Sequence, residues 1–470
     1  LFATVVVLLA VIISLLKVSL PYADNYKRDI EEYLLSEFSA DVRIGSIGAS
    51  WQKFGPVLEF KNISLTANEK APLDLSIRET KVTINFWKSI QEQRLVTGVF
   101  RLEGINTFIN SDVFFKVRPQ SQGTQLFEGL SHLFLRQIEQ FEIEDSTVLV
   151  RHKDGQFQTF QLENFSWFNL GNRHRGQGDV YVDGFSDNSL SIIMDLYGQR
   201  RSEIFGQIFV EAKQVDITPW LTQIIGDHIS VQSTEGSFKA WSKVSDGLVN
   251  EILLDMEKTG VKWLKQQELK ELSVDNAILQ WTNQKKGWEL LAKDIVLSSN
   301  AKPTPPFSLQ LNDNESGLTL YSQEIDVNAT TQLFSLFSAT KQSTLLANSN
   351  VNGRVDKLHL HWPKQGEFAG QIIVSDFSFL PPSKPGAYLG LSDLTLNGAW
   401  KGNAGRFIAS GENGQLSTAN TFAKEIDYQS LKIDTSLLLH DDNILVSLPH
   451  IHLKNDDIEV NLAAQYQTRE

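Results

Sequence analysis

Apolar and polar residues alternate along most of the chain. Alternate side chains of a β-strand point to opposite faces of its sheet, so a period of two predicts strands with one apolar and one polar face. The positions with the clearest alternation are expected to line one continuous apolar surface. These positions are Val82, Ile84, Phe86, Leu190, Ile192, Met194, Leu196, Ile372, Val374, Leu394, Leu396, Ile458, Val460 and Leu462.

Turn-forming residues separate the alternating segments. Asp, Asn and Gly favour turns because they adopt positive φ or bond their own backbone. Clusters of these residues occur at 153–155, 402–405, 413–414, 441–443 and 455–457. Strands joined by such short turns form an antiparallel meander. The pattern therefore predicts a mostly β protein.

A few segments interrupt the strand pattern. Residues 24–40 have apolar residues at helical spacing and begin with Asp24, a residue type that caps helices. Residues 119–140 and 330–346 are also predicted to be helical, whereas the prolines within 303–306 predict a loop or a strand edge.

The N-terminal residues predict a membrane anchor. Residues 1–16 carry no charge, and Thr4 and Ser14 are their only hydroxyl residues. A helix of residues 1–20 would span about 30 Å, the thickness of a hydrocarbon core. A cleaved signal peptide is the alternative, but it needs small residues at the cleavage site, where Pro21 stands. Because the chain begins with Leu1, we expect it to be a fragment of a longer protein.

Composition restricts the class of protein. The 470 residues include no cysteine, which excludes disulfides, thiolate metal sites and cysteine nucleophiles. The net charge of −13 disfavours nucleic acid as a partner and a broad polybasic membrane-binding surface. The ten Trp and 28 Phe residues need burial in a core, in a ligand or in lipid.

Candidate catalytic and metal-binding patterns have simpler interpretations. His359 and His361, like the pair at 450 and 452, lie on one face of a predicted strand, but no acidic residue completes a ligand set at predictable spacing. The acidic pairs at 441–442 and 456–457 fall in predicted turns. No phosphate-binding loop or nucleophile motif is present. We therefore expect no enzymatic activity, no cofactor and no metal.

A weak internal repeat places Trp near the end of a strand. Residues 236–241, 353–362 and 394–400 each end in Trp, and a return strand is predicted to follow each of them. If the repeat is structural, each hairpin contacts only its neighbours in an elongated sheet.

The N-terminal segments resemble a known family. After the predicted anchor the chain reads Val42–Ile47, Trp51–Phe60 and Ile63–Leu65, followed by two further short strands. This order is similar to the N-terminal region of AsmA-like envelope proteins, most closely of the YhdP type, over residues 1–110. The resemblance implies a transmembrane anchor at 1–20, an AsmA-like β module with a short helix at 21–110, and a curved, repetitive antiparallel β-groove at 111–470 that continues beyond the fragment.

The resemblance also implies a function. It predicts a bridge-like lipid transfer protein, held in the bacterial inner membrane by one span, that moves phospholipids through the periplasm towards the outer membrane and so supports the permeability barrier. A periplasmic or outer-membrane partner is expected at the missing C-terminal end. Two alternatives remain open from the residues: stacked β-sandwiches satisfy the same alternation, and a non-catalytic assembly factor would bind other envelope proteins.

Overall fold

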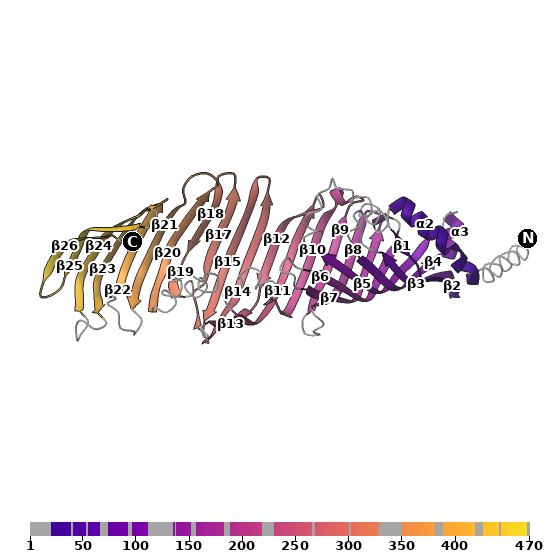
Figure 1. The fold of residues 1–470 in the computed structure, drawn as a ribbon, viewed down its shortest axis with the longest axis horizontal. Helices are drawn as coiled ribbons and strands as arrows, with labels where there is room; N and C mark the ends of the chain where they lie inside the picture. The colour runs from indigo at the N-terminus through magenta and orange to yellow at the C-terminus, as the bar shows by residue number, and fades with distance from the viewer. Residues whose placement is uncertain are drawn as a thin grey trace, which may run out of the picture. The chain divides into compact units, whose positions relative to one another are not determined.

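The computed structural model describes most of the chain. Its described residues are 20–38, 41–52, 55–65, 74–92, 96–110, 135–136, 138–151, 157–182, 189–218, 230–265, 268–299, 302–328, 350–380, 389–418, 426–440 and 443–467. They form 26 strands and a few short helices (Figure 1). They divide into an N-terminal unit, up to Asp216 with Lys239–Asn250, and a C-terminal unit, Ile217–Phe238 and the residues from Glu251 onwards.

The sheet of the N-terminal unit pairs strands that follow one another in the chain. Pairing is antiparallel from β2 to β10 except between β5 and β6, which are parallel. The strands are β1 (Val42–Arg43), β2 (Ser46–Gln52), β3 (Gly55–Leu65), β4 (Asp74–Ile84), β5 (Thr97–Asn110), β6 (Gln140–Arg151), β7 (Phe157–Leu170), β8 (Arg173–Val182), β9 (Ser189–Tyr197) and β10 (Phe205–Val215). The parallel pair is a departure from the predicted antiparallel sheet.

Short helices accompany the first strands of this unit (Figure 1). They are η1 (Leu20–Tyr26), α2 (Lys27–Phe38) and α3 (Phe86–Glu92), with η3 (Arg201–Glu203) between β9 and β10. Asp24 does not cap α2. It lies within η1, and its carboxylate accepts a hydrogen bond from the Ile47 N–H at 2.8 Å, while Glu31 accepts one from the Ile44 N–H at 2.8 Å. These two bonds attach the helices to the β1–β2 segment.

The prediction that Phe86 continues a strand is wrong. Phe86 is the first residue of α3, and the Asn85 side chain accepts a hydrogen bond from the Lys88 N–H at 3.2 Å. An asparagine at this position satisfies a free N–H group of the first helical turn, so it starts a helix where the alternating pattern predicts more strand. Phe86 packs edge-to-face on Trp51 with 5.3 Å between the ring centroids.

The C-terminal unit is an antiparallel meander. β11 (Ser230–Ser245) and β12 (Leu248–Met256) contribute residues to both units. The following strands are β13 (Thr259–Lys265), β14 (Glu268–Gln284), β15 (Gly287–Ser299), β16 (Lys302–Pro303), β17 (Phe307–Asn314), β18 (Gly317–Gln323), β19 (Ile325–Asp326), β20 (Asn350–Pro363), β21 (Ala369–Leu380), β22 (Leu389–Lys401), β23 (Ala404–Thr418), β24 (Ile426–His440), β25 (Asn443–Lys454) and β26 (Glu459–Gln467).

The predicted turns have different outcomes. Residues 455–457 form the predicted turn, in which the Asn455 side chain accepts hydrogen bonds from the N–H groups of Asp457 and Ile458. Residues 402–403 also form a turn. The turn predicted at 413–414 is wrong, because both residues lie inside β23 and Asn413, with φ 54°, forms an irregularity in that strand. Residues 153–155 and 441–442 lie outside the described residues.

Several predicted helical segments lie mostly outside the described residues. This applies to residues 1–19 of the predicted anchor and to 330–346. Within 119–140, Leu135 and Arg136 form a single π-helical turn and Gln140 begins β6. Within the part of the chain that the structure describes, no helix is both long enough and apolar enough to cross a membrane.

Candidate functional site

One face of the N-terminal sheet is apolar from β2 to β10. Residues that are paired across neighbouring strands point to the same face. One row of pairs consists of Ala49, Leu58, Val82, Phe100, Phe141, Trp167, Gly176, Met194 and Ile208. No charged residue interrupts this row, so the apolar surface continues across these strands.

The other face of the same sheet is charged from β3 to β6 and mixed from β7 to β10. The neighbouring row consists of Glu59, Lys81, Arg101, Glu142, Ser166, Gln177, Ile193 and Phe209. Ion pairs cross between its strands, such as Arg101 with Glu142 at 2.9 Å and Arg173 with Asp195 at 2.6 Å. The hydrogen bond from Arg173 holds the pKa of the Asp195 carboxyl below its usual value. This charged face suits contact with water.

The C-terminal unit has the same two-faced construction. One apolar row runs from β14 to β24 and consists of Leu279, Ala292, Leu309, Ser322, Leu358, Ile372, Gly398, Phe407 and Thr435. A second row consists of Val355, Val374, Leu396, Ala409, Ile433, Ile451 and Leu462. Both rows lie on the same face. In β21 to β24 the two members of a strand are two residues apart, and in β20 a bulge lies between Val355 and Leu358 and keeps both on this face.

Neighbouring strands of this unit bulge at corresponding places. Asp376, Asp393 and Asn413, on β21, β22 and β23, have φ between 51° and 57°, and the register shifts beside the first two. Asp and Asn tolerate this left-handed conformation better than most residues, and a bulge bends its strand. We call the apolar residues beside these bulges, Val374, Leu394 and Leu431, the elbow; each is at most 4% exposed.

A buried tyrosine closes the elbow. Tyr428 lies over Gly411 and Gly414 of β23, where a side chain at either position would collide with its hydroxyl. Its O–H donates a hydrogen bond to the Ser392 carbonyl. Burial, with a smaller contribution from the charge of Asp393, raises the pKa of the phenol to about 12. The phenol is therefore neutral at physiological pH and holds neighbouring strands together at the bend.

Away from the elbow the apolar face is open. Ile372, Leu396 and Ile433 are half-buried, although they share a face with the fully buried residues of the elbow. Within each unit the described strands belong to one hydrogen-bonded sheet, so no second sheet of described strands covers this face as a stacked sandwich requires. Among the described residues this face is therefore buried at the elbow and partly exposed beside it. We call the partly exposed parts the walls and the whole apolar face the trough.

Aromatic rings lie flat against these walls. In the N-terminal unit the ring of Trp167 lies over Gly176, where an added Cβ would be 2.7 Å from it. Trp400 lies over Gly370 and Phe407 over Gly398 in the same way. Glycine opposite an aromatic residue lets the ring cover bare backbone, an arrangement known to stabilise strands. At these positions the apolar face consists of aromatic rings that cover the glycine backbone of the neighbouring strand.

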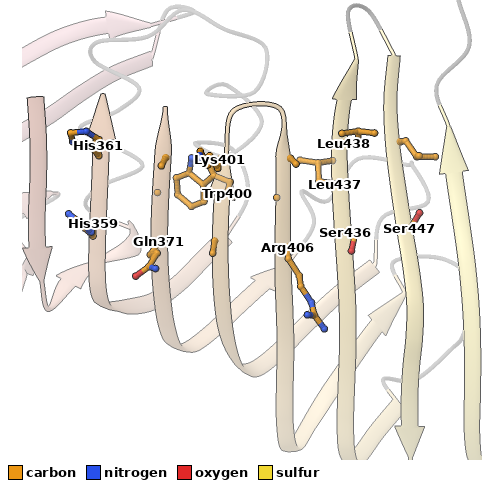
Figure 2. A pocket seen from close by; sticks show the side chains of 16 residues that line it. His359, His361, Gln371, Trp400, Lys401, Arg406, Ser436, Leu437, Leu438 and Ser447 are labelled. Atoms are coloured by element: carbon orange, nitrogen blue, oxygen red, sulfur yellow. The ribbon is translucent and has the colours of Figure 1, made fainter. Parts of the chain in front are cut away.

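The polar face of the C-terminal unit carries a shallow hollow of about 740 Å³ (Figure 2). Two cross-strand rows form most of it. The first contains His359, Gln371, Ala399, Arg406, Ser436 and Ser447, and the second contains His361, Ala369, Lys401, Ala404, Leu438 and Leu445. Arg406 pairs with Asp434 at 2.6 Å and lowers the pKa of that carboxyl.

The histidine pairs have structural partners. His361 Nδ1 lies 3.0 Å from the Thr319 hydroxyl, and His452 Nδ1 lies 3.0 Å from the Asn461 side-chain oxygen. Among the described residues no group of three or more His, Cys, Asp or Glu side chains is placed to hold a metal ion. His361 and His452 thus lie on strands and each contacts a polar side chain of the neighbouring strand.

Comparison with known proteins identifies the family. The sequence model of the family described as YhdP protein matches residues 1–470. The chain belongs to the YhdP protein family. It is 26% identical over 311 residues to the intermembrane phospholipid transporter YhdP of Escherichia coli strain K12. That match covers 66% of this chain and 24% of the relative, so the chain spans about a quarter of the relative's length. No solved structure gives a significant match.

The structure gathers most of the predicted lining residues on the apolar faces. In the N-terminal unit, register relates Val82 to the β9 residues Leu190, Ile192, Met194 and Leu196. In the C-terminal unit it places the predicted residues of β21, β22 and β26 together, namely Ile372, Val374, Leu394, Leu396, Val460 and Leu462. That these residues line a lipid path stays a prediction.

Four predicted positions need separate comment. Phe86 lies in α3 and is not a strand residue. Ile458 is in the turn before β26, where its N–H donates to the Asn455 side chain, and it is 53% exposed. Leu462, inside β26, is 57% exposed. Ile84 is the last residue of β4 and pairs with Thr97 beyond a register shift. Alternation alone does not detect where a strand ends.

Sequence reasoning missed the aromatic residues of the walls. Phe100, Phe141, Phe165 and Trp167 pack together in the N-terminal unit, with 5.8 Å between the ring centroids of Phe141 and Trp167. The sequence does carry one sign of these rings. Gly176 and the glycine at 178 lie opposite Trp167 and Phe165, where a larger side chain would collide with the rings. The cross-strand pairing that gives the two glycines this role is not visible in the local sequence.

Proposed function

We propose that this chain is part of a bridge-like phospholipid transfer protein. In this proposal residues 1–20 anchor the protein in the inner membrane by a single span, and phospholipids move across the periplasm towards the outer membrane with their acyl chains against the apolar faces. Transfer of this kind maintains the outer-membrane permeability barrier. The chain acts as a conduit and performs no catalysis, and a periplasmic or outer-membrane partner protein receives the lipids.

The open apolar face is the observation that carries the proposal. Many of its described residues are half-buried, and its rows are unbroken by charge across many strands, whereas a soluble protein normally covers such a surface. Burying one methylene group of an acyl chain contributes about 0.8 kcal/mol, so lipid tails are favourable occupants. The name of the Escherichia coli relative, an intermembrane phospholipid transporter, agrees with this occupant.

Photocrosslinking in living cells tests lipid occupancy. We would place p-benzoylphenylalanine at Phe165, on the apolar face of β7, and at the next residue, Ser166, on the polar face. After growth in ³²P-phosphate and irradiation, the intact protein should carry labelled phospholipid when the probe is at Phe165.

The adjacent position is the control for this experiment. Ser166 has the same strand and the same expression background but faces the charged side, so it should give little label. Equal labelling at the two positions, or no label at Phe165, would show that phospholipid does not select the apolar face.

A further inference from the structure

We infer that phospholipids lie in the C-terminal unit with their phosphate-bearing ends along one particular edge of its sheet. This inference rests on the proposed function and adds the orientation of the lipid and the residues that hold its headgroup. We call this edge the tryptophan rim; it is the edge that carries Trp281, Trp288, Trp362 and Trp400. The opposite edge, with residues 302–306 and the turn at 455–458, is the far rim.

Contacts between hairpin turns define the tryptophan rim. Lys286 forms an ion pair with Glu315 at 2.8 Å, which links the turn after β14 to the turn after β17. The Lys364 N–H donates to the Ser316 carbonyl, and the Gly402 N–H donates to the Phe368 carbonyl at 2.7 Å. These turns therefore lie side by side along one edge.

The four tryptophans stand just inside this edge on the apolar face. Each lies within a few residues of a turn, and register assigns each to the apolar side of its strand. The rings of Trp362, Phe368, Trp400 and Phe407 follow one another with centroid separations of 4.9, 6.0 and 6.3 Å. The remaining described tryptophan of this unit, Trp263, is fully buried near the far rim.

The indole N–H groups of the rim are available to a ligand. Among the described residues none of the four has a hydrogen-bond acceptor, and all four side chains are at least partly exposed. In the N-terminal unit, by contrast, the Trp167 N–H donates to Asn169 at 2.8 Å. Tryptophan is enriched where hydrocarbon meets water, because its ring is apolar and its N–H bonds ester and phosphate oxygens.

Charge distinguishes the two rims. Among the described residues, the turns of the tryptophan rim and their flanking residues carry four lysines against three acids, Asp313, Glu315 and Glu367. Three of these lysines, Lys285, Lys364 and Lys401, have no ion pair among the described residues. The described turns of the far rim and their flanking residues are mainly acidic, with Lys302 and Lys454 against Glu324, Asp326, Asp456, Asp457 and Glu459. A phosphate anion is attracted to the first rim and repelled by the second.

The depth of the wall fits an acyl chain. Trp400 and Leu394 are six residues apart on β22, so about 20 Å of strand separates the rim from the closed elbow. One leaflet of a bilayer is about 15 Å deep, half of a hydrocarbon core. A lipid whose phosphate lies at the rim therefore keeps its tails on apolar wall and ends them near the elbow.

Photoreactive phospholipids test this orientation on the intact protein. One probe carries a diazirine on the headgroup, and the other carries it at the terminal methyl end of an acyl chain. Mass spectrometry should find the headgroup probe on residues 361–371 and 398–407, and the acyl probe near Val374 and Leu394. Headgroup labelling concentrated at 302–309 and 450–458 would overturn the inference while leaving the proposed function standing. Absence of labelling by both probes would overturn both.

Charge variants provide a second readout that does not depend on folding. Lys364→Gln, which changes an exposed lysine in a turn of the tryptophan rim, should reduce headgroup labelling at the rim about fivefold, because a lysine near an anionic lipid surface contributes about 1 kcal/mol. Lys302→Gln is the matched control, since it removes an exposed lysine from the far rim. Equal losses in the two variants, or none in Lys364→Gln, would contradict the assignment of the phosphate to the tryptophan rim.

Discussion

Ile192→Asp is expected to abolish lipid passage without unfolding the protein. Ile192 lies on the apolar face of β9, paired with Gly178 and Val210, and its side chain is half-buried. A carboxylate there removes about 0.8 kcal/mol for each displaced methylene contact and adds a desolvation cost of several kcal/mol when tails press against it. In the proposed function lipids pass along the apolar face of this unit, so a single charged barrier on it should stop them. Without lipid the carboxylate meets water, so the fold should tolerate it.

The neighbouring isoleucine supplies the control for this variant. Ile193 is on the opposite face of the same strand and is 49% exposed, so Ile193→Asp should leave both protein level and transport unchanged. We would measure protein level and outer-membrane integrity together. A normal level with a defective barrier in Ile192→Asp agrees with the proposal. A normal level with an intact barrier contradicts the conduit, and loss of the protein contradicts an open trough.

Leu394→Ala should destabilise the bend of the C-terminal unit by about 2–5 kcal/mol. Leu394 is 2% exposed and packs with Tyr428 and Leu431, so truncation leaves a cavity that the bulged strands cannot close. Local opening is the appropriate measure, since a long chain with two units does not unfold in one step. Hydrogen exchange of peptides covering 394–412 reports it directly.

A second leucine on the same strand makes the test specific. Leu396 lies on the same face but is half-buried, outside the elbow. Leu396→Ala should therefore lower the opening free energy clearly less than Leu394→Ala. Equal loss of protection in the two variants would contradict the claim that Leu394 is in the buried part of the apolar face and Leu396 in its partly exposed part.

The face of a strand was predictable, but its ends and its partners were less so. Alternation placed the even-numbered residues of β9 from Leu190 to Leu196 on one face. The register agrees, because no bulge interrupts that strand. Alternation failed at Phe86, since Asn85 starts a helix by accepting a local hydrogen bond that periodicity does not register. The turn predicted at 413–414 from its Asn–Gly sequence was also wrong. An asparagine with positive φ can form a bulge within a strand as well as a turn between strands.

The site was predictable in character more than in detail. The period of two indicates an apolar face, but it does not say whether that face is covered, because coverage depends on strands far apart in the sequence. The rim illustrates the same limit. A faint recurrence of Trp before turns was visible in the sequence, yet only the pairing of β14, β15, β20 and β22 shows that Trp281, Trp288, Trp362 and Trp400 share one edge.

Lipid analysis of the purified intact protein tests the central claim most directly. The protein would be extracted, separated from bulk membrane and analysed for phospholipid by mass spectrometry, beside the Ile192→Asp and Ile193→Asp variants. We expect several phospholipids per chain for the unaltered protein and for Ile193→Asp, with fewer for Ile192→Asp, because only that variant places a charge on the apolar face. Phospholipid absent from the unaltered protein, or equal in all three samples, would contradict the claim that the apolar face carries lipid.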